Sequence, residues 1–370
     1  MAERGTTDLR AARFFDGDRM HGGTRVLIED GSVVAIEPCT SGHDHELLSP
    51  GFVDLQVNGW GPCDAAVADA ATLQGLDESL ATLGTTSWLA TLVTDSLERM
   101  ATRTRSIDEL RSASAPGCVG IHLEGPFLGR RKGAHATRHI VEVDFPWLAS
   151  LPASVRLVTL GAEAAGAEDG IRVLRAAGIT VSIGHTEPDA VQFENAVTAG
   201  ATVVTHLFNA MSGVHHREFG VATAALTDER LVCGLIADLV HVSAEAVKLA
   251  FRARPGGICL VSDCVAWQSE WAVARGVAVS AGAPRLPDGT LAGSSTSLAE
   301  CVRRAIVECG IEPGLVLAAA TSRPADTVGL RGAGRIVVGG GGDVVALDRG
   351  YSVAGVWRRL PSSRDHAIDN

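Results

Sequence analysis

The sequence lacks both cysteine pairs and long apolar stretches. Its eight cysteines are scattered singly through 370 residues, with no CxxC, and a chain of this length can bury enough apolar surface to fold without disulfides. We therefore expect reduced thiols. No run reaches the roughly 20 apolar residues of a membrane span, and the start of the chain has no continuous apolar stretch typical of a signal peptide. We expect a cytoplasmic protein.

Lysine is also scarce, since Lys132 and Lys248 are the only two, and almost all positive charge comes from arginine. Acidic residues outnumber basic ones, and the formal net charge is -11. This charge repels nucleic acids and anionic membrane surfaces, so we expect neither as a partner. An anionic substrate would need a local cationic patch.

A GxGxxG run after the first expected strand is missing, which argues against a dinucleotide-binding fold. Instead, short β-branched runs alternate with longer Ala- and Leu-rich helical patterns. We expect eight strands, near residues 52–58, 85–91, 118–124, 156–160, 179–184, 202–206, 232–237 and 258–263. Eight strand-helix units over roughly 270 residues indicate an α/β fold, a (β/α)₈ barrel of about 250 residues.

The two ends of the chain have a different pattern. Residues 25–29 and 32–36 alternate around Asp30-Gly31, which is typical of a hairpin, and residues 334–338, 343–347 and 352–357 also resemble short antiparallel strands. We expect the ends to form one small β-sandwich domain. The predicted boundaries are 1–49 and 334–370 for this domain, with the barrel at 50–333.

Four polar residues lie at the carboxyl ends of four expected barrel strands, the face where barrel enzymes place their catalytic groups. They are Glu124, His185, His206 and Asp263. Each alone also fits a structural role, as a hydrogen-bonded core histidine or a helix cap. Their shared position at one end of the barrel favours a functional site.

Two imidazoles and one carboxylate form a three-ligand set that leaves a position open for water, as in catalytic zinc sites. A bound cation lowers the pKa of that water and polarises a carbonyl. A further group must accept the water proton and return it to the departing amine of an amide. We predict that Glu124, His185 and His206 bind one divalent cation and that Asp263 transfers the proton.

At these residues the sequence resembles the amidohydrolase superfamily and, within it, the N-acetylglucosamine-6-phosphate deacetylases. The most specific matching runs are His122-Leu-Glu-Gly-Pro-Phe127, Thr205-His-Leu-Phe-Asn-Ala-Met211 and Asp288-Gly-Thr-Leu-Ala-Gly-Ser294. The resemblance implies hydrolysis of N-acetylglucosamine 6-phosphate to glucosamine 6-phosphate and acetate, by a homodimer.

The resemblance also bears on the number of metal ions. Most superfamily members have a His-x-His pair at the end of the first strand, where this chain has Gln56 and Asn58. Amide side chains bind zinc-like ions poorly, so we expect these second-metal positions to be vacant. An alternative use is a hydrogen bond across the barrel mouth. We expect one ion per subunit, zinc first, with Fe²⁺, Co²⁺ or Mn²⁺ also suited to the ligands.

For the substrate, the resemblance implies that His135 lies near the acetamide or sugar. In the predicted mechanism, His135 or the metal stabilises the oxyanion. Asn209 and Ala210 would offer backbone amides, while Arg217 and His241 would bind the phosphate, in part across a subunit interface. Arg217 also fits an ordinary surface arginine, and His241 a helix cap.

Three other functions remain open. The loop His216-Arg-Glu-Phe-Gly220 differs from the family pattern, so the substrate could be the galacto epimer or an unphosphorylated N-acetylamino sugar. An N-acyl amino acid would suit the same scaffold. The third is a non-catalytic binding or assembly module, which would be expected to have lost its ligands.

Overall fold

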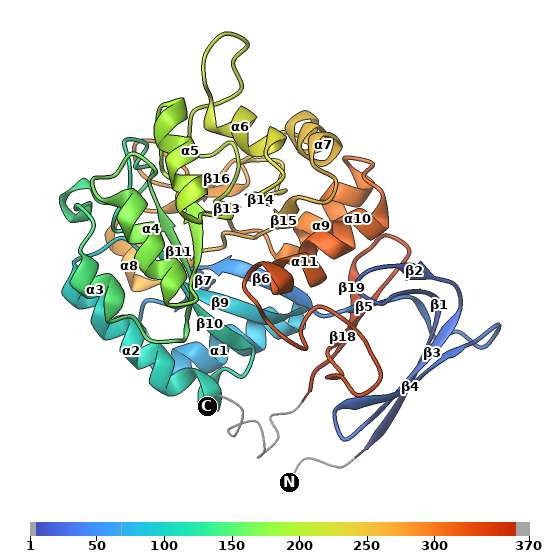
Figure 1. Cartoon of the computed structure of the whole chain (residues 1–370). Coiled ribbons are helices and arrows are strands. Elements are labelled where there is room, and N and C mark those ends of the chain that lie inside the picture. Colours follow the sequence, from blue (N-terminus) through green and yellow to red (C-terminus); the bar gives the residue numbers. More distant parts are fainter. Residues whose placement is uncertain (1–4, 68, 360–370) are drawn as a thin grey trace.

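The computed structural model describes residues 5–67 and 69–359. Its central feature is an eight-stranded parallel sheet with the order β15-β14-β13-β12-β11-β10-β9-β6, curved into a barrel (Figure 1). The strands are β6 (Phe52–Val57), β9 (Thr85–Val93), β10 (Cys118–Glu124), β11 (Val155–Leu160), β12 (Thr180–Ile183), β13 (Val203–Val204), β14 (Val232–Leu235) and β15 (Ile258–Leu260). All eight expected strands are present, and the predicted barrel is confirmed.

Helices surround this sheet (Figure 1). They are α1 (Ala70–Thr82), α2 (Leu97–Ser114), α3 (Phe145–Ala149), α4 (Ala167–Ala176), α5 (Ala190–Ala199), α6 (Val221–Thr227), α7 (Ala244–Ala253), α9 (Leu298–Val307), α10 (Pro313–Ala320) and α11 (Ser322–Thr327), with a 3₁₀ turn η1 (Thr137–His139). Local sequence sets where several begin. Ser96 caps α2, and Asp189 forms a capping box with Gln192 at the start of α5.

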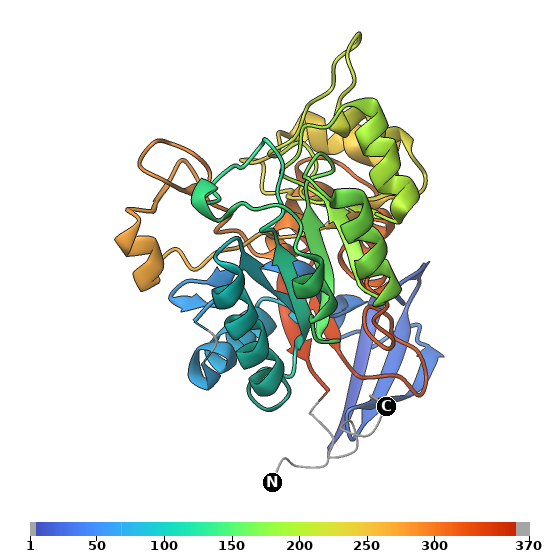
Figure 2. The same ribbon diagram turned by 60° about the vertical axis from the view of Figure 1, so that its left-hand side comes forward.

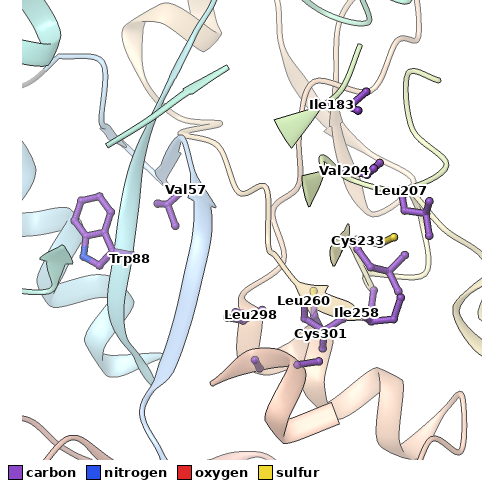
Figure 3. Packing of buried hydrophobic residues seen from close by; sticks show 14 of the residues in the cluster. Val57, Trp88, Ile183, Val204, Leu207, Cys233, Ile258, Leu260, Leu298 and Cys301 are labelled. Carbon is purple, nitrogen blue, oxygen red and sulfur yellow. The ribbon is translucent and has the colours of Figure 1, made fainter. Parts of the chain in front are cut away.

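Side chains that alternate along the strands fill two different spaces. On β11, Leu157 belongs to a cluster that also contains Leu55 and Leu89, while its neighbour Val158 belongs to the larger core shared with the helices. Figure 3 shows part of that larger core, where Leu260 of β15 lies beside Cys301 of α9. The barrel is therefore packed on both sides of its wall.

The two chain ends form one small β domain, as predicted, but its described strands belong to a single sheet and not to the two facing sheets of the expected sandwich. Its strands are hydrogen-bonded in a single seven-stranded sheet: β1 (Thr6–Phe15), β2 (Met20–His21), β3 (Thr24–Glu29), β4 (Ser32–Pro38), β5 (His45–Pro50), β18 (Val344–Leu347) and β19 (Val353–Trp357). The expected hairpin joins β3 to β4, and Asp30 and Gly31 have φ of 49° and 77°, as a type I′ turn requires.

One predicted strand is wrong. Residues 334–338 are irregular, because Gly334 adopts a φ of 72° and the Ile336 amide donates to Asp16 O at 2.9 Å instead of joining a ladder. Ile336 still packs in the core of the small domain. The domain boundaries stay a prediction, and residues 360–370 of the expected C-terminal part lie outside the described residues.

Short excursions extend beyond the barrel. The turn β7 (Gly59–Trp60) to β8 (Cys63–Asp64) follows β6, and the segment after β15 carries α8 (Glu270–Ala274), β16 (Ala278–Ser280) and β17 (Ala283–Arg285), which project to the left in Figure 2. The loop at residues 212–219 projects beyond α6 at the top of Figure 1. Within the described ranges, no helix combines the length and apolarity needed to cross a membrane.

Candidate active site

The four strand-end residues predicted from the sequence meet at the carboxyl end of the barrel. Glu124 is the last residue of β10, and His185 and His206 each follow their strands, β12 and β13, by two residues. Asp263 comes three residues after β15. Parallel strands point their carboxyl ends the same way, so the fold converts four distant sequence positions into one cluster.

Glu124, His185 and His206 form a tight triangle. The Oε1 atom of Glu124 lies 3.1 Å from Nε2 of His185 and 3.1 Å from Nε2 of His206, and the two nitrogens are 3.0 Å apart. Ligands at bond lengths of about 2.0–2.1 Å and tetrahedral angles are about 3.3 Å apart. The triangle therefore has dimensions that suit one small divalent cation.

The hydrogen bonds around these imidazoles also fit a metal. Nδ1 of His185 lies 3.1 Å from the carbonyl oxygen of Arg131, which accepts a hydrogen bond from this nitrogen, so that Nε2 carries the lone pair of the neutral imidazole. Nδ1 of His206 is buried without a hydrogen-bond partner. Two nitrogens and a carboxylate oxygen facing one another at about 3 Å need a shared positive charge, either protons or a cation.

His135 adds a third imidazole to this group. Its Nε2 lies 3.2 Å from Nε2 of His185 and 4.0 Å from Oε2 of Glu124, and these three buried residues offer ligand atoms within 4.8 Å of one another. Burial, and then repulsion from His185, lower the pKa of His135 to about 3. His135 is therefore neutral, and its ring can donate a hydrogen bond to a substrate or a nitrogen lone pair to a cation.

The two carboxyl groups of the site have opposite pKa shifts. Burial raises the pKa of Glu124, but hydrogen bonds from His185 and His206 outweigh it and hold this pKa well below its ordinary value. Burial, and then the charge of Glu124, raise the pKa of Asp263 to about 7, against opposing effects of His206 and His241. The site thus favours the charged form of Glu124 and the protonated form of Asp263 up to near neutral pH.

The amides at the expected vacant metal positions bind these same carboxyl groups. Nε2 of Gln56 donates to Oε1 of Glu124 at 3.1 Å, and Nδ2 of Asn58 donates to Oδ1 of Asp263 at 2.9 Å. Both amides therefore make the hydrogen bonds across the barrel mouth that the sequence left as their alternative use.

Backbone strain is concentrated around the site. His185, His206 and Asp263 adopt positive φ of 49°, 31° and 48°, and Phe208 and Ala210 in the loop after β13 have φ of 76° and 48°. Non-glycine residues adopt this region rarely, at a cost of about 1–3 kcal/mol each, and such residues cluster where function demands a particular geometry.

The residues expected to bind substrate differ in their hydrogen bonds and in their exposure. The amide of Asn209 already donates to His206 O at 2.9 Å. His241 donates through Nδ1 to the buried carboxylate of Asp238 at 2.7 Å. Arg217 is exposed on the loop 212–219, which extends beyond α6 (Figure 1), and no side-chain hydrogen bond among the described residues links it to the cluster.

One supporting residue was missed by the sequence analysis. The Oε1 atom of Glu163 accepts the backbone amides of Arg130 and Glu187 at 2.8 and 2.7 Å. These amides belong to the two segments that carry Arg131 and His185, so Glu163 holds together the residues that orient a metal-ligand candidate. Its position after the β11 run was visible in the sequence, but its partners are distant along the chain.

The comparisons with known proteins agree with this geometry. Residues 47–362 match the amidohydrolase family. The chain belongs to this family. This amidohydrolase is 34% identical over 340 residues to an N-acetylglucosamine-6-phosphate deacetylase of Bos taurus, covering 84% of this chain and 82% of that protein. It is 32% identical over 365 residues to an N-acetylgalactosamine-6-phosphate deacetylase of Escherichia coli O157:H7, covering 94% and 97%.

Solved structures of deacetylases are also similar to this chain. The amidohydrolase resembles the N-acetyl-D-glucosamine-6-phosphate deacetylase of Mycobacterium smegmatis, solved as a mutant in complex with N-acetyl-D-glucosamine-6-phosphate, with a TM-score of 0.88 at 28% identity. The match covers 96% of this chain and 98% of that one. The predicted family and enzyme class are confirmed.

Proposed function

We propose that this amidohydrolase removes the acetyl group of N-acetylglucosamine 6-phosphate, giving glucosamine 6-phosphate and acetate. The observation that carries the proposal is the Glu124–His185–His206 triangle at the barrel mouth, where Asn58 also holds the Asp263 carboxyl by a hydrogen bond of 2.9 Å. Relatives that span most of the chain are deacetylases of N-acetylamino sugar phosphates, which supports this substrate class.

The chain's own residues would share the chemistry as follows. A divalent cation bound by Glu124, His185 and His206 would supply Lewis acidity toward a carbonyl and toward a water. Asp263, deprotonated, accepts the proton of the attacking water and then delivers it to the amine nitrogen as the amide bond breaks. His135, neutral and buried, donates a hydrogen bond to the oxyanion that develops on the acetyl oxygen.

We further propose a single cation per subunit, with zinc as the first candidate. The nitrogen of the Gln56 side chain faces Glu124 and that of Asn58 faces Asp263, each as a hydrogen-bond donor. Amide side chains bind zinc-like ions poorly, and both amides are already engaged as donors to these carboxyl groups. Metal analysis of purified protein checks the number, and a ratio near two per subunit would contradict it.

The phosphate is assigned to Arg217 and His241, with Arg217 supplied by a second subunit. The loop 212–219, which carries Arg217, extends beyond α6 (Figure 1), and it exposes the apolar side chains of Val214 and Phe219, as a segment that packs against another copy would. We therefore propose a homodimer, which a solution measurement of molecular mass tests.

A second substrate is supported by a particular comparison. N-acetylgalactosamine-6-phosphate deacetylases are 32% identical over 365 residues and 34% identical over 321 residues, close to the values for the gluco enzymes. The deciding experiment is a deacetylation assay of metal-loaded enzyme on both phosphosugars, the unphosphorylated sugars and an N-acyl amino acid. The proposal fails if N-acetylglucosamine 6-phosphate is not hydrolysed, or if the galacto epimer has the higher kcat/KM.

The non-catalytic module that the sequence left open is not proposed, because relatives that span most of the chain are deacetylases and all four predicted groups are present. A metal content well below one per subunit, together with no hydrolysis after zinc is added, would support an inert protein.

A further inference from the structure

The barrel sheet has a seam next to its proton-transferring residue. Among the described residues, β6 and β15 are the two ends of the sheet and do not pair with each other. β15 ends at Leu260, so Asp263 lies beyond the regular hydrogen-bond ladder. Other contacts must therefore hold the segment that carries it.

The carboxylate of Asp54 bridges this seam. Its Oδ1 atom accepts the backbone amide of Ser262 at 3.2 Å and that of Gln56 at 3.2 Å. The hydroxyl of Ser262 donates back to Gln56 O at 3.4 Å, and an isolated parallel bridge joins Val57 to Cys264. Asp54 thus adds a side-chain tie across the seam at Ser262, one residue before Asp263, beside the backbone amides of Asn58 and Gly59 that donate to Cys264 O at 2.8 and 3.2 Å.

A carboxylate is a costly choice for this place. Asp54 is 1% exposed, its Oδ2 has no hydrogen-bond partner, and burial raises its pKa to about 6. An apolar side chain would avoid the cost of burying a charged group, but it would leave the backbone amides of Gln56 and Ser262 without this acceptor. Asp54 therefore serves these two amides and not the packing of the core.

The same strand also controls the side chain of Asp263. Asn58, just beyond β6, donates to Oδ1 of Asp263 at 2.9 Å, and the Asp263 carbonyl accepts the amide of Ser294 at 2.8 Å. With a φ of 48°, Asp263 has a strained backbone that its surroundings must maintain. Asp54 holds the residue immediately before it.

We propose that Asp54 is a positioning residue, which ties segment 262–264 to β6 and so directs the Asp263 carboxyl toward the substrate. The inference rests on the proposed deacetylase function. We assign Asp54 no direct contact with substrate or cation, because the oxygen that it uses accepts two backbone amides.

The test compares Asp54→Ala with Asp54→Asn. Loss of the bridge lets the Asp263 carboxyl shift, and a displacement of about 1 Å costs about 10²-fold in turnover. We expect kcat of Asp54→Ala to fall by that amount while KM and metal content stay unchanged. Asp54→Asn should recover most of the turnover, because its amide oxygen can accept both backbone amides.

The matched control is Asp77→Asn. Asp77 is also a buried aspartate, 3% exposed. It accepts hydrogen bonds from the side chains of Trp88 and Arg358 and makes none with segment 262–264. This control should lower the unfolding midpoint and leave kcat per folded enzyme unchanged. If Asp54→Ala does not fold, Asp54→Val takes its place with the same expectations.

A second measurement does not depend on the reaction. Amide hydrogen exchange of residues 258–264, followed by mass spectrometry, should be faster in Asp54→Ala than in wild type and unchanged in Asp77→Asn. An inactive wild-type enzyme would end the proposed function, whereas unchanged exchange in Asp54→Ala would overturn the bridge. Normal kcat in Asp54→Ala, or no recovery in Asp54→Asn, would also overturn the positioning role.

Discussion

Replacing Asp263 with asparagine should stabilise the metal-free protein above neutral pH while it removes catalysis. In the folded protein the pKa of Asp263 is raised from 3.8 to about 7, so between these values the folded state holds a proton that the unfolded chain has released. The contribution of this group is therefore present at low pH and is lost as the pH rises through this interval. Asparagine has no proton to lose.

The magnitude follows from the pKa shift. A displacement of about three units corresponds to at most about 4 kcal/mol at about 1.36 kcal/mol per unit, and partial contact of Asp263 with solvent reduces it. We expect Asp263→Asn to be more stable than wild type by about 1–4 kcal/mol near pH 8 and by little near pH 4. Turnover should fall by about 10²–10⁴-fold, as expected for loss of a general base.

The assay is urea unfolding of chelator-treated protein at several pH values. Asp77→Asn is the control, because it loses its ion pair with Arg358 at 2.9 Å and should be less stable than wild type by about 1.5–3 kcal/mol. The reasoning would be refuted if wild type and Asp263→Asn differed by the same amount at about pH 4.5 and about pH 8. Near-normal turnover of Asp263→Asn would refute its catalytic role.

Three further predictions concern the same site. The kcat/KM of the metal-loaded enzyme should fall on the acid side with a midpoint at or below pH 7, because Asp263 acts deprotonated and a nearby cation lowers its pKa further; a midpoint above pH 8 would contradict this. Arg217→Ala should raise KM for the phosphosugar by about 10–100-fold and leave the unphosphorylated sugar unaffected, whereas Arg230→Ala, another exposed arginine, should change neither. Glu163→Ala should weaken metal binding by about 10–100-fold in a chelator competition, and equal affinity in Glu163→Ala and the surface control Glu168→Ala would exclude the supporting role.

Much of the fold follows from local patterns. The barrel strands are short runs rich in β-branched and other apolar residues. Successive side chains along a strand point to opposite sides of the sheet, so Leu157 and Val158 belong to different clusters. Residues 334–338 mislead because β-branched residues stand between glycines there, and the positive φ of Gly334 turns the chain away from the sheet.

The candidate ligands could be predicted for a related reason. Parallel strands of a barrel bring their carboxyl ends together. The four candidates lie at the carboxyl ends of predicted strands: Glu124, His185, His206 and Asp263. His135 and Arg217 lie on long loops, where no periodicity indicates direction. Only the structure places the His135 imidazole within 3.2 Å of His185 and shows that Arg217 is exposed on its loop.

The sequence by itself determined the barrel, the small domain of both chain ends and the identity of the metal-ligand candidates, because these depend on residue type and on spacing along single strands. Tertiary structure alone decided the 3.0–3.1 Å triangle, the raised pKa of Asp263 and the bridge from Asp54 to Ser262. Each of these depends on distances between residues far apart in the chain and on how much water burial removes, which no local pattern encodes.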